Sequence, residues 1–151
     1  MEEQIMNMPA VALRGLTILP GMIAHFDISR ERSLRAVEEA MEQDQKIYLV
    51  TQRNVDSEDP TQEDLYQMGI VADIKQVVRL QNDVVRILVD GISRAALLGF
   101  TGNEKYLEAE ICYCDSNADS LPEDLREAML LGVREAFHRY AAVVGKISKE
   151  L

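Results

Sequence analysis

The chain has 151 residues, the length of one ordinary domain, and 47% of them are hydrophobic, enough to form a buried core. Its formal net charge of −10 at pH 7 gives an average field that repels nucleic-acid phosphates and anionic membranes. No apolar run is long enough to cross a bilayer, and Glu2 and Glu3 stand where a secretory signal carries positive charge, so we expect a cytoplasmic protein.

The first third of the chain is predicted to begin a β-sheet. Residues 1–8 have no clear period and are expected to form a loose end. The apolar, β-branched-rich run 11–19 predicts a strand, and Pro20-Gly21 predicts a tight turn after it. Residues 23–28 alternate between apolar and polar side chains, which predicts a second strand with one buried face.

A helix is expected to follow these strands and to pack on the sheet. Ser29 is predicted to cap a helix over residues 30–43. Its apolar stripe, at helical spacing, contains Leu34, Val37, Ala40 and Met41. Residues 47–50 suit a short buried strand, and the polar, acidic stretch 52–64 predicts a mobile surface loop.

The centre of the chain is predicted to be mainly β. Residues 64–68 suggest one helical turn that stops at Gly69. The apolar runs 70–80 and 84–89 flank the turn residues 81–83, which predicts a β-hairpin. Asp90-Gly91 is expected to turn the chain again into a third strand of a meander, over 92–98.

A further alternating strand is expected over residues 106–113, and the only two cysteines lie at its end. Cys112 and Cys114 lie on one face of an extended segment, near the upper Cα separation for an unstrained disulfide. The two histidines, His25 and His138, show no ligand spacing toward them. We therefore predict packing or surface cysteines, with no disulfide and no metal site, and an outward-facing His25.

The character of the sequence changes at Asp115. Residues 115–119 form a polar linker, and Ser120 with Glu123 makes a capping-box pattern with Pro122 in the first turn. A helix with an apolar face from Leu125 onward is expected there. We thus predict an α+β protein with a mainly β domain over 1–114 and the start of a helical subdomain over 115–151, cut from a longer protein.

Four blocks of the chain, in order, carry a family resemblance across residues 8–111. They are Leu13-Arg14-Gly15 with Leu19-Pro20-Gly21-Met22 and Arg30-Glu31-Arg32-Ser33, then 46–52, 64–72 and 84–95. Together these blocks resemble the N-terminal domain of the Lon family of ATP-dependent proteases. The resemblance implies a PUA-like twisted sheet or pseudo-barrel with one packed helix, followed by a C-terminal helix.

The residues themselves give no sign of catalysis. The chain contains no Gly-rich phosphate loop, no G-x-S-x-G elbow and no H-E-x-x-H motif. The resemblance implies that an ATPase, with its ATP and Mg²⁺, and a Ser-Lys peptidase lie beyond Leu151. We therefore expect a non-catalytic fragment that needs no cofactor.

The resemblance implies a domain that helps to recognise and hold unfolded or damaged protein substrates and supports assembly of a homo-oligomeric ring. An exposed patch of apolar residues near turns is one candidate surface, and it contains Met22, Ile23, Tyr66 and Met68. A charged strand-to-helix corner is the other, and it contains Arg30, Glu31 and Arg32.

Each interpretation has an alternative. Core packing would account for at least half of the apolar candidates, and the charged corner would suit a solvated helix start.

Arg14 and Arg94 interrupt strands and are expected to pair with acidic partners inside the fold. A free-standing Lon-N-like adaptor or ligand-binding protein is the alternative function. RNA binding would need a basic patch, for which Arg79, Arg86 and Arg94 are the candidates.

Overall fold

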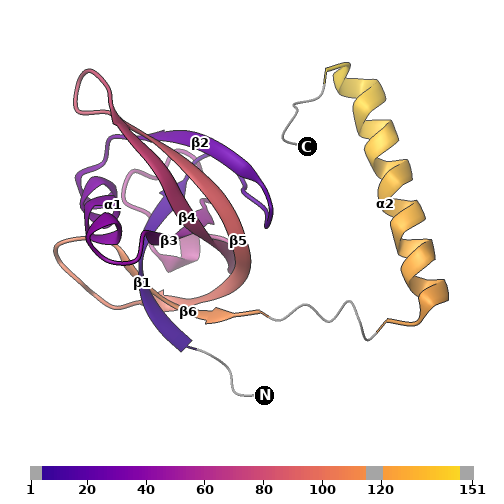
Figure 1. Cartoon of the computed structure of the whole chain (residues 1–151), viewed down its shortest axis with the longest axis horizontal. Helices are drawn as coiled ribbons and strands as arrows, with labels where there is room; N and C mark the ends of the chain where they lie inside the picture. The colour runs from indigo at the N-terminus through magenta and orange to yellow at the C-terminus, as the bar shows by residue number, and fades with distance from the viewer. Residues whose placement is uncertain (1–4, 115–120, 147–151) are drawn as a thin grey trace. The chain divides into compact units, whose positions relative to one another are not determined.

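The computed structural model describes residues 5–114 and 121–146, and it divides into two compact units, Met1–Cys114 and Asp115–Leu151. The first unit is mainly β (Figure 1). Its elements are β1 (Ile5–Leu13), β2 (Ile23–Ile28), α1 (Glu31–Glu42), β3 (Lys46–Thr51), the short 3-10 helix η1 (Gln62–Asp64), β4 (Met68–Arg79), β5 (Val85–Phe100) and β6 (Glu108–Tyr113). The second unit contains α2 (Glu123–Val144).

The six strands form one sheet that closes on itself. Their order is β2-β5-β4-β3-β1-β6, and β6 also pairs with β5. Only β1 and β3 run parallel to each other, and every other pair is antiparallel. Five strands therefore make a small barrel, and β2 extends the sheet from the first half of β5. The predicted mainly β fold with a packed helix and a C-terminal helix is confirmed.

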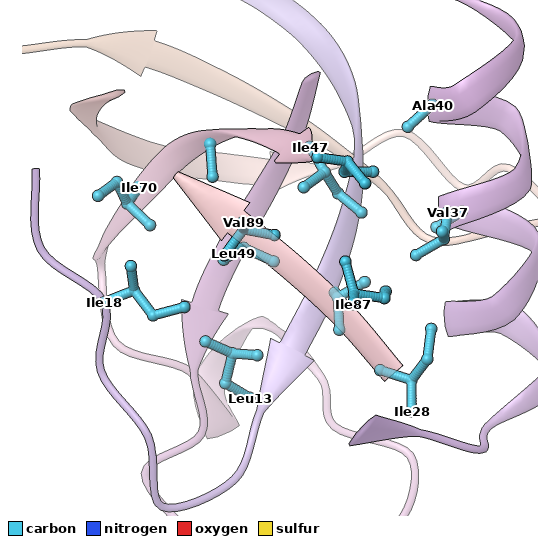
Figure 2. Packing of buried hydrophobic residues seen from close by; sticks show 14 of the residues in the cluster. Leu13, Ile18, Ile28, Val37, Ala40, Ile47, Leu49, Ile70, Ile87 and Val89 are labelled. Carbon is cyan, nitrogen blue, oxygen red and sulfur yellow. The ribbon is translucent and has the colours of Figure 1, made fainter. Parts of the chain in front are cut away.

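The closed sheet produces two apolar cores, one on each face of β1 and β3. The barrel interior is filled by Met8, Ala10, Ala12, Tyr48, Val50, Leu65, Val71, Ala95, Leu97, Ala109 and Ile111. The other core lies between the barrel, β2 and α1, and Figure 2 shows Val37 and Ala40 of α1 directed toward Ile47 and Ile87. Tyr48, in the barrel, donates a hydrogen bond from its hydroxyl to the Ala95 carbonyl oxygen at 3.0 Å.

The predicted turn at Asp90-Gly91 is wrong. β5 continues through both residues, and Figure 1 shows it as a long, strongly curved strand. The β4–β5 register shifts between Val71 and Ala72, a bulge that lets β5 bend. A Cβ on Gly91 would clash with the backbone carbonyl oxygen of Leu19 and would lie 2.8 Å from Cδ1 of Ile70, so close approach of another backbone segment, rather than a turn, requires glycine there.

The start of the sheet also differs from the prediction. Residues 5–8 are not a loose end, because Ile5 to Pro9 pair with β6. The first strand ends at Leu13 rather than at residue 19. The predicted Pro20-Gly21 turn is present: the Met22 amide donates to the Leu19 carbonyl oxygen at 3.1 Å, and Gly21 has a φ of 80°.

The helical boundaries require two corrections. Ser29 does not cap α1, because Arg30 is the N-cap residue and no side chain bonds to the cap. The helical turn expected over 64–68 lies earlier, at η1, where Thr61 and Asp64 form a capping box. Residues beyond it extend, so Gly69 lies inside β4 rather than ending a helix.

The predicted β4–β5 hairpin is confirmed. Asn82 and Asp83 adopt φ values of 60° and 59°, the pair of left-handed conformations that a type I′ turn needs. The polar stretch 52–64 forms a surface loop, as expected, although Gln52 at its start is buried.

The second unit holds a 22-residue helix with no buried side chain. Pro122 is its N-cap residue rather than part of its first turn, and the predicted linker 115–119 and the Ser120 cap lie outside the described residues. Gly145 ends the helix in a left-handed conformation. No helix in the described ranges combines the length and hydropathy needed to span a membrane.

Candidate functional site

A row of apolar side chains crosses four strands on the outside of the barrel. Met68 of β4 lies opposite Ala96 of β5, and Ala96 lies opposite Cys112 of β6. Cys112 in turn lies opposite Ile5 of β1. Directly opposed residues point to the same face of a sheet. The next residues along the strands, Gly69 and Ala95, lie toward the barrel interior, so the row faces outward.

Two more apolar residues widen this row. The Leu97 amide donates to the Gln67 carbonyl oxygen at 2.7 Å, which continues the β4–β5 register and brings Leu98 opposite Tyr66. Met68, Tyr66 and Leu98 are 45%, 49% and 42% exposed. We call this set the outer apolar surface, and it consists of Ile5, Tyr66, Met68, Ala96, Leu98 and Cys112.

The edge of the outer apolar surface is suited to adaptable contacts. The guanidinium of Arg53 lies 5.2 Å from the centre of the Tyr66 ring, a cation–π arrangement that orients the ring. The sulfur of Cys114 lies 3.8 Å from the sulfur of Met68. Methionine side chains are flexible and polarizable, so they fit partners of differing shape.

The four apolar residues predicted to form a patch do not lie together. Tyr66 and Met68 belong to the outer apolar surface. Ile23 is 56% exposed, but it lies opposite Asp90, in the half of β5 that pairs with β2. Met22 is half-buried and packs against the core beside α1. Of the four, only Met22 packs against the core, so the expectation that core packing would account for at least half of this set is wrong.

The three charged residues of the strand-to-helix corner make contacts within the domain. Arg30 donates to the side-chain oxygen of Gln52 at 2.7 Å, and Arg32 donates to the carbonyl oxygen of Asn103 at 2.9 Å. Glu31 forms an ion pair with Arg35, one turn along α1. The hydrogen bonds of Arg30 and Arg32 thus connect the start of the helix to neighbouring loops. That the corner also binds a partner stays a prediction.

A cavity of about 230 Å³ lies where the ends of β1 and β2 meet the start of α1. No sequence pattern indicated this cavity, because its walls come from three separate segments. Arg14 reaches its rim and donates to the Ser57 carbonyl oxygen at 3.3 Å. Arg14 is exposed, and neither Arg14 nor Arg94 forms an ion pair among the described residues, so the predicted internal pairing is wrong.

The arginines proposed as an RNA-binding patch are largely neutralised. Arg86 holds Asp27 through two hydrogen bonds of 2.8 and 3.1 Å across the β2–β5 pair. Arg79 lies 4.0 Å from Glu38. The hydrogen bond from Arg86 lowers the pKa of the Asp27 carboxyl below its usual value, and His25, exposed as predicted, adds a weaker effect.

Replacing Arg86 with glutamine is expected to return the pKa of Asp27 toward its ordinary value of about 3.9. Because the folded-state pKa is lowered, the pair stabilises the fold above the unfolded pKa, and this contribution is lost as pH falls through the folded pKa. An NMR titration of the Asp27 carboxyl carbon measures the change. Arg94→Gln is the control, and an Asp27 midpoint that stays low in Arg86→Gln contradicts the assignment.

No group of His, Cys, Asp and Glu in the described part of the chain is arranged to hold a metal ion. Residues 7–151 match the family model of the ATP-dependent protease La (LON) substrate-binding domain.

The chain belongs to the Lon substrate-binding domain family.

Relatives of known name agree with this assignment. The chain is 37% identical over its whole length to the Lon protease of Lachnoclostridium phytofermentans and 35% identical over 99% of its length to that of Clostridium acetobutylicum. It spans 19% of the length of each of these proteases. The family predicted from the four sequence blocks is confirmed.

Solved structures of Lon N-terminal domains share the fold. The N-terminal domain of a Mycobacterium avium complex Lon protease superposes with a TM-score of 0.64 at 17% identity, covering 96% of this chain and 78% of that one. A Lon N-terminal domain protein from Xanthomonas campestris gives a TM-score of 0.58 at 16% identity, covering 83% of this chain and 74% of that one.

The Lon-type domain thus carries two candidate binding features, the outer apolar surface and the cavity at the start of α1. Sequence reasoning found Tyr66 and Met68 but missed Ile5, Ala96 and Leu98. The sequence carried part of the signal for these residues. They stand at outward positions of β1 and β5 and are apolar, whereas the outward positions of a solvent-exposed strand are usually polar. Which of them meet depends on strand register, which the sequence pattern did not reveal.

Proposed function

We propose that this domain holds unfolded or damaged protein chains for a Lon-type ATP-dependent serine protease. The outer apolar surface is the observation that carries the proposal. It joins side chains from β1, β4, β5 and β6 into one outward face, and exposed apolar surfaces rimmed by polar residues commonly mark protein-binding sites.

Unfolded chains differ from folded ones in exposing apolar segments, so a surface of adaptable apolar side chains discriminates between them without reading a sequence. Each contact of this kind is weak. Several copies of the domain on one ring would raise the overall affinity through multivalency. We therefore include self-association of the full-length protein in the proposal.

The chemistry of proteolysis belongs, in this proposal, to other parts of the full-length protein. A downstream ATPase would use ATP and Mg²⁺, and a Ser-Lys dyad would cleave the substrate. The domain described here would act in the cytoplasm, with neither nucleic acid nor membrane as a partner, in keeping with its charge of −10.

A glutamate at Met68 or at Leu98 is expected to weaken binding of an unfolded protein by about tenfold, because a buried apolar contact is replaced by a charge that loses its water. Titration of the 151-residue chain with a permanently unfolded protein, followed by light scattering, measures the affinity. The same protein in its folded form should not bind.

Val78→Glu is the matched control. Val78 lies on the same strand as Met68 and is 39% exposed, but it lies opposite Arg86, away from the outer apolar surface. Equal weakening by Val78→Glu would show a general charge effect. Unchanged binding in both Met68→Glu and Leu98→Glu would exclude the outer apolar surface as the capture site.

A further inference from the structure

The cavity at the start of α1 has two chemically different sides. Leu13, Leu16, Phe26 and Ile28 supply apolar side chains to its wall. Arg14, Arg30 and Ser33 supply polar hydrogen-bond donors. Its volume of about 230 Å³ lies below the roughly 300–1,000 Å³ typical of pockets for drug-sized ligands, so it suits a group the size of one amino-acid residue.

Two arginines that line this cavity converge on one acceptor. Arg14 and Arg30 donate to the same Ser57 carbonyl oxygen, at 3.3 and 3.4 Å, and neither forms an ion pair among the described residues. Burial, and next the charge of Arg14, lower the pKa of Arg30. Each guanidinium has five N–H groups, so most of these donors remain available.

The first turn of α1 adds to the positive potential of the cavity. The Leu34 amide makes the first hydrogen bond of the helix, to the Arg30 carbonyl oxygen at 2.9 Å, and no side chain caps the amides before it. Uncapped amides and the helix dipole favour an anion at this end of a 12-residue helix.

Ser33 provides an independent indication of a ligand. Ser33 is only 6% exposed and lines the cavity. Its hydroxyl nevertheless makes no hydrogen bond within the described residues. No side-chain oxygen in the described ranges is both fully covered and without a partner. Because Ser33 lines the cavity, its hydroxyl is available there to a polar group of a ligand.

The negative groups nearby leave the positive side of the cavity accessible. Asp27 lines the cavity, but Arg86 binds both of its oxygens. Glu58 and Asp59 act on Arg30 more weakly than Arg14 does. Glu31 is engaged by Arg35.

We propose that this cavity binds the C-terminal residue of a captured polypeptide, with its carboxylate on Arg14, Arg30 and Ser33 and its apolar side chain on the opposite wall. This inference rests on the proposed function, since it names the part of a captured chain that the cavity holds. A terminal apolar residue uses both sides of the cavity. An acidic side chain or a free phosphate uses only the polar side.

A fluorescent, unstructured peptide that ends in leucine with a free carboxylate tests the proposal. Measured by fluorescence anisotropy with the 151-residue chain, it should bind at least tenfold more tightly than the same peptide with an amidated C-terminus. Arg14→Gln and Arg30→Gln should each remove most of this difference. Amide shifts of Ser33 and Phe26 in NMR spectra should accompany binding of the free acid.

Arg32→Gln is the matched control, because Arg32 lies in the same helical turn but donates to Asn103 and Tyr106 outside the cavity. Arg14 is exposed, so Arg14→Gln tests the cavity without disturbing the core. Equal affinity for the acid and the amide overturns the proposal, as does a preference that persists in Arg14→Gln or disappears equally in Arg32→Gln.

Inorganic phosphate and acetate separate the possible sources of the anion. Competition by millimolar phosphate with no preference for the peptide acid would indicate a site for free oxyanions and overturn the proposal. Failure of the proposed function is distinguishable, because it is measured on Met68→Glu and Leu98→Glu with an unfolded protein. If Met68→Glu and Leu98→Glu lose binding of the unfolded protein while the peptide acid and the peptide amide bind equally, the proposed function stands and only this inference fails.

Discussion

Gly69→Ala is expected to destabilise the β domain by about 3 kcal/mol, at the upper end of typical overpacking effects. A Cβ at position 69 would lie 2.5 Å from Cζ of Tyr48 and 2.6 Å from the carbonyl oxygen of Leu49. Tyr48 cannot move away easily, since it is fully buried in the barrel and its hydroxyl is bonded to the Ala95 carbonyl oxygen. The backbone oxygen is fixed by the sheet itself.

Urea unfolding followed by circular dichroism measures this change as a lower midpoint. Gly99→Ala is the control, because Gly99 lies on β5 and its added Cβ would be 3.6 Å from the side chain of Gln62, an ordinary contact. We expect that variant to change stability by less than about 0.5 kcal/mol. A Gly69→Ala midpoint equal to that of Gly99→Ala would mean that the barrel interior can relax around the added methyl group.

Ile87→Ala is expected to cost about 3 kcal/mol, within the range for truncating a fully buried isoleucine. Ile87 has no exposed surface, and it lies in the middle of the core beside α1 (Figure 2). Its strand position is opposite Phe26 on one side and Val77 on the other. Truncation leaves a cavity that β2 and β4 cannot close, because hydrogen bonds to β5 hold both strands in register.

The matched control is Ile92→Ala on the same strand. Ile92 is 44% exposed, so removing the same atoms should cost less than about 1 kcal/mol. Thermal unfolding by calorimetry compares the two variants. Similar losses at both positions would show that the curved part of β5 near Ile92 packs more tightly than its exposure indicates.

The sequence predicted the parts of the fold whose signals are local. The β4–β5 hairpin was identified because its turn and its two apolar runs adjoin, and the alternation in residues 23–28 correctly placed Ala24 and Ile28 inside. Helix α1 was predicted within one residue at each end, although the cap at Ser29 was wrong.

Features that depend on distant partners were not predictable in this way. Residues 5–8 look irregular until β6 supplies a partner strand, which lies at the far end of the domain sequence. Asp90-Gly91 has the composition of a turn, yet Gly91 is needed because the backbone carbonyl oxygen of Leu19 approaches it closely. Composition alone does not distinguish these two uses of glycine.

The candidate site also combines features with a local sequence signal and features that depend on distant parts of the chain. Tyr66 and Met68 were candidates for exposure because they lie beside a predicted turn, with core packing as the alternative, whereas their neighbours Ile5 and Leu98 are brought to them by strand pairing. The cavity at the start of α1 depends on tertiary structure, since Arg14, Phe26 and Ser33 come from three segments. The corner arginines were noticed for their charge, but their loop contacts required the fold.

The pairing of β1 with β6 closes the barrel between the first and the last strand of the β domain. During synthesis from the N-terminus, β1 can find β3 early, but its other edge stays unpaired until residues 108–113 leave the ribosome. Met8, Ala10 and Ala12 remain uncovered over the same interval. Because such long-range pairing is slow, we expect the nascent domain to complete its folding in one late step, with an aggregation-prone edge exposed before it.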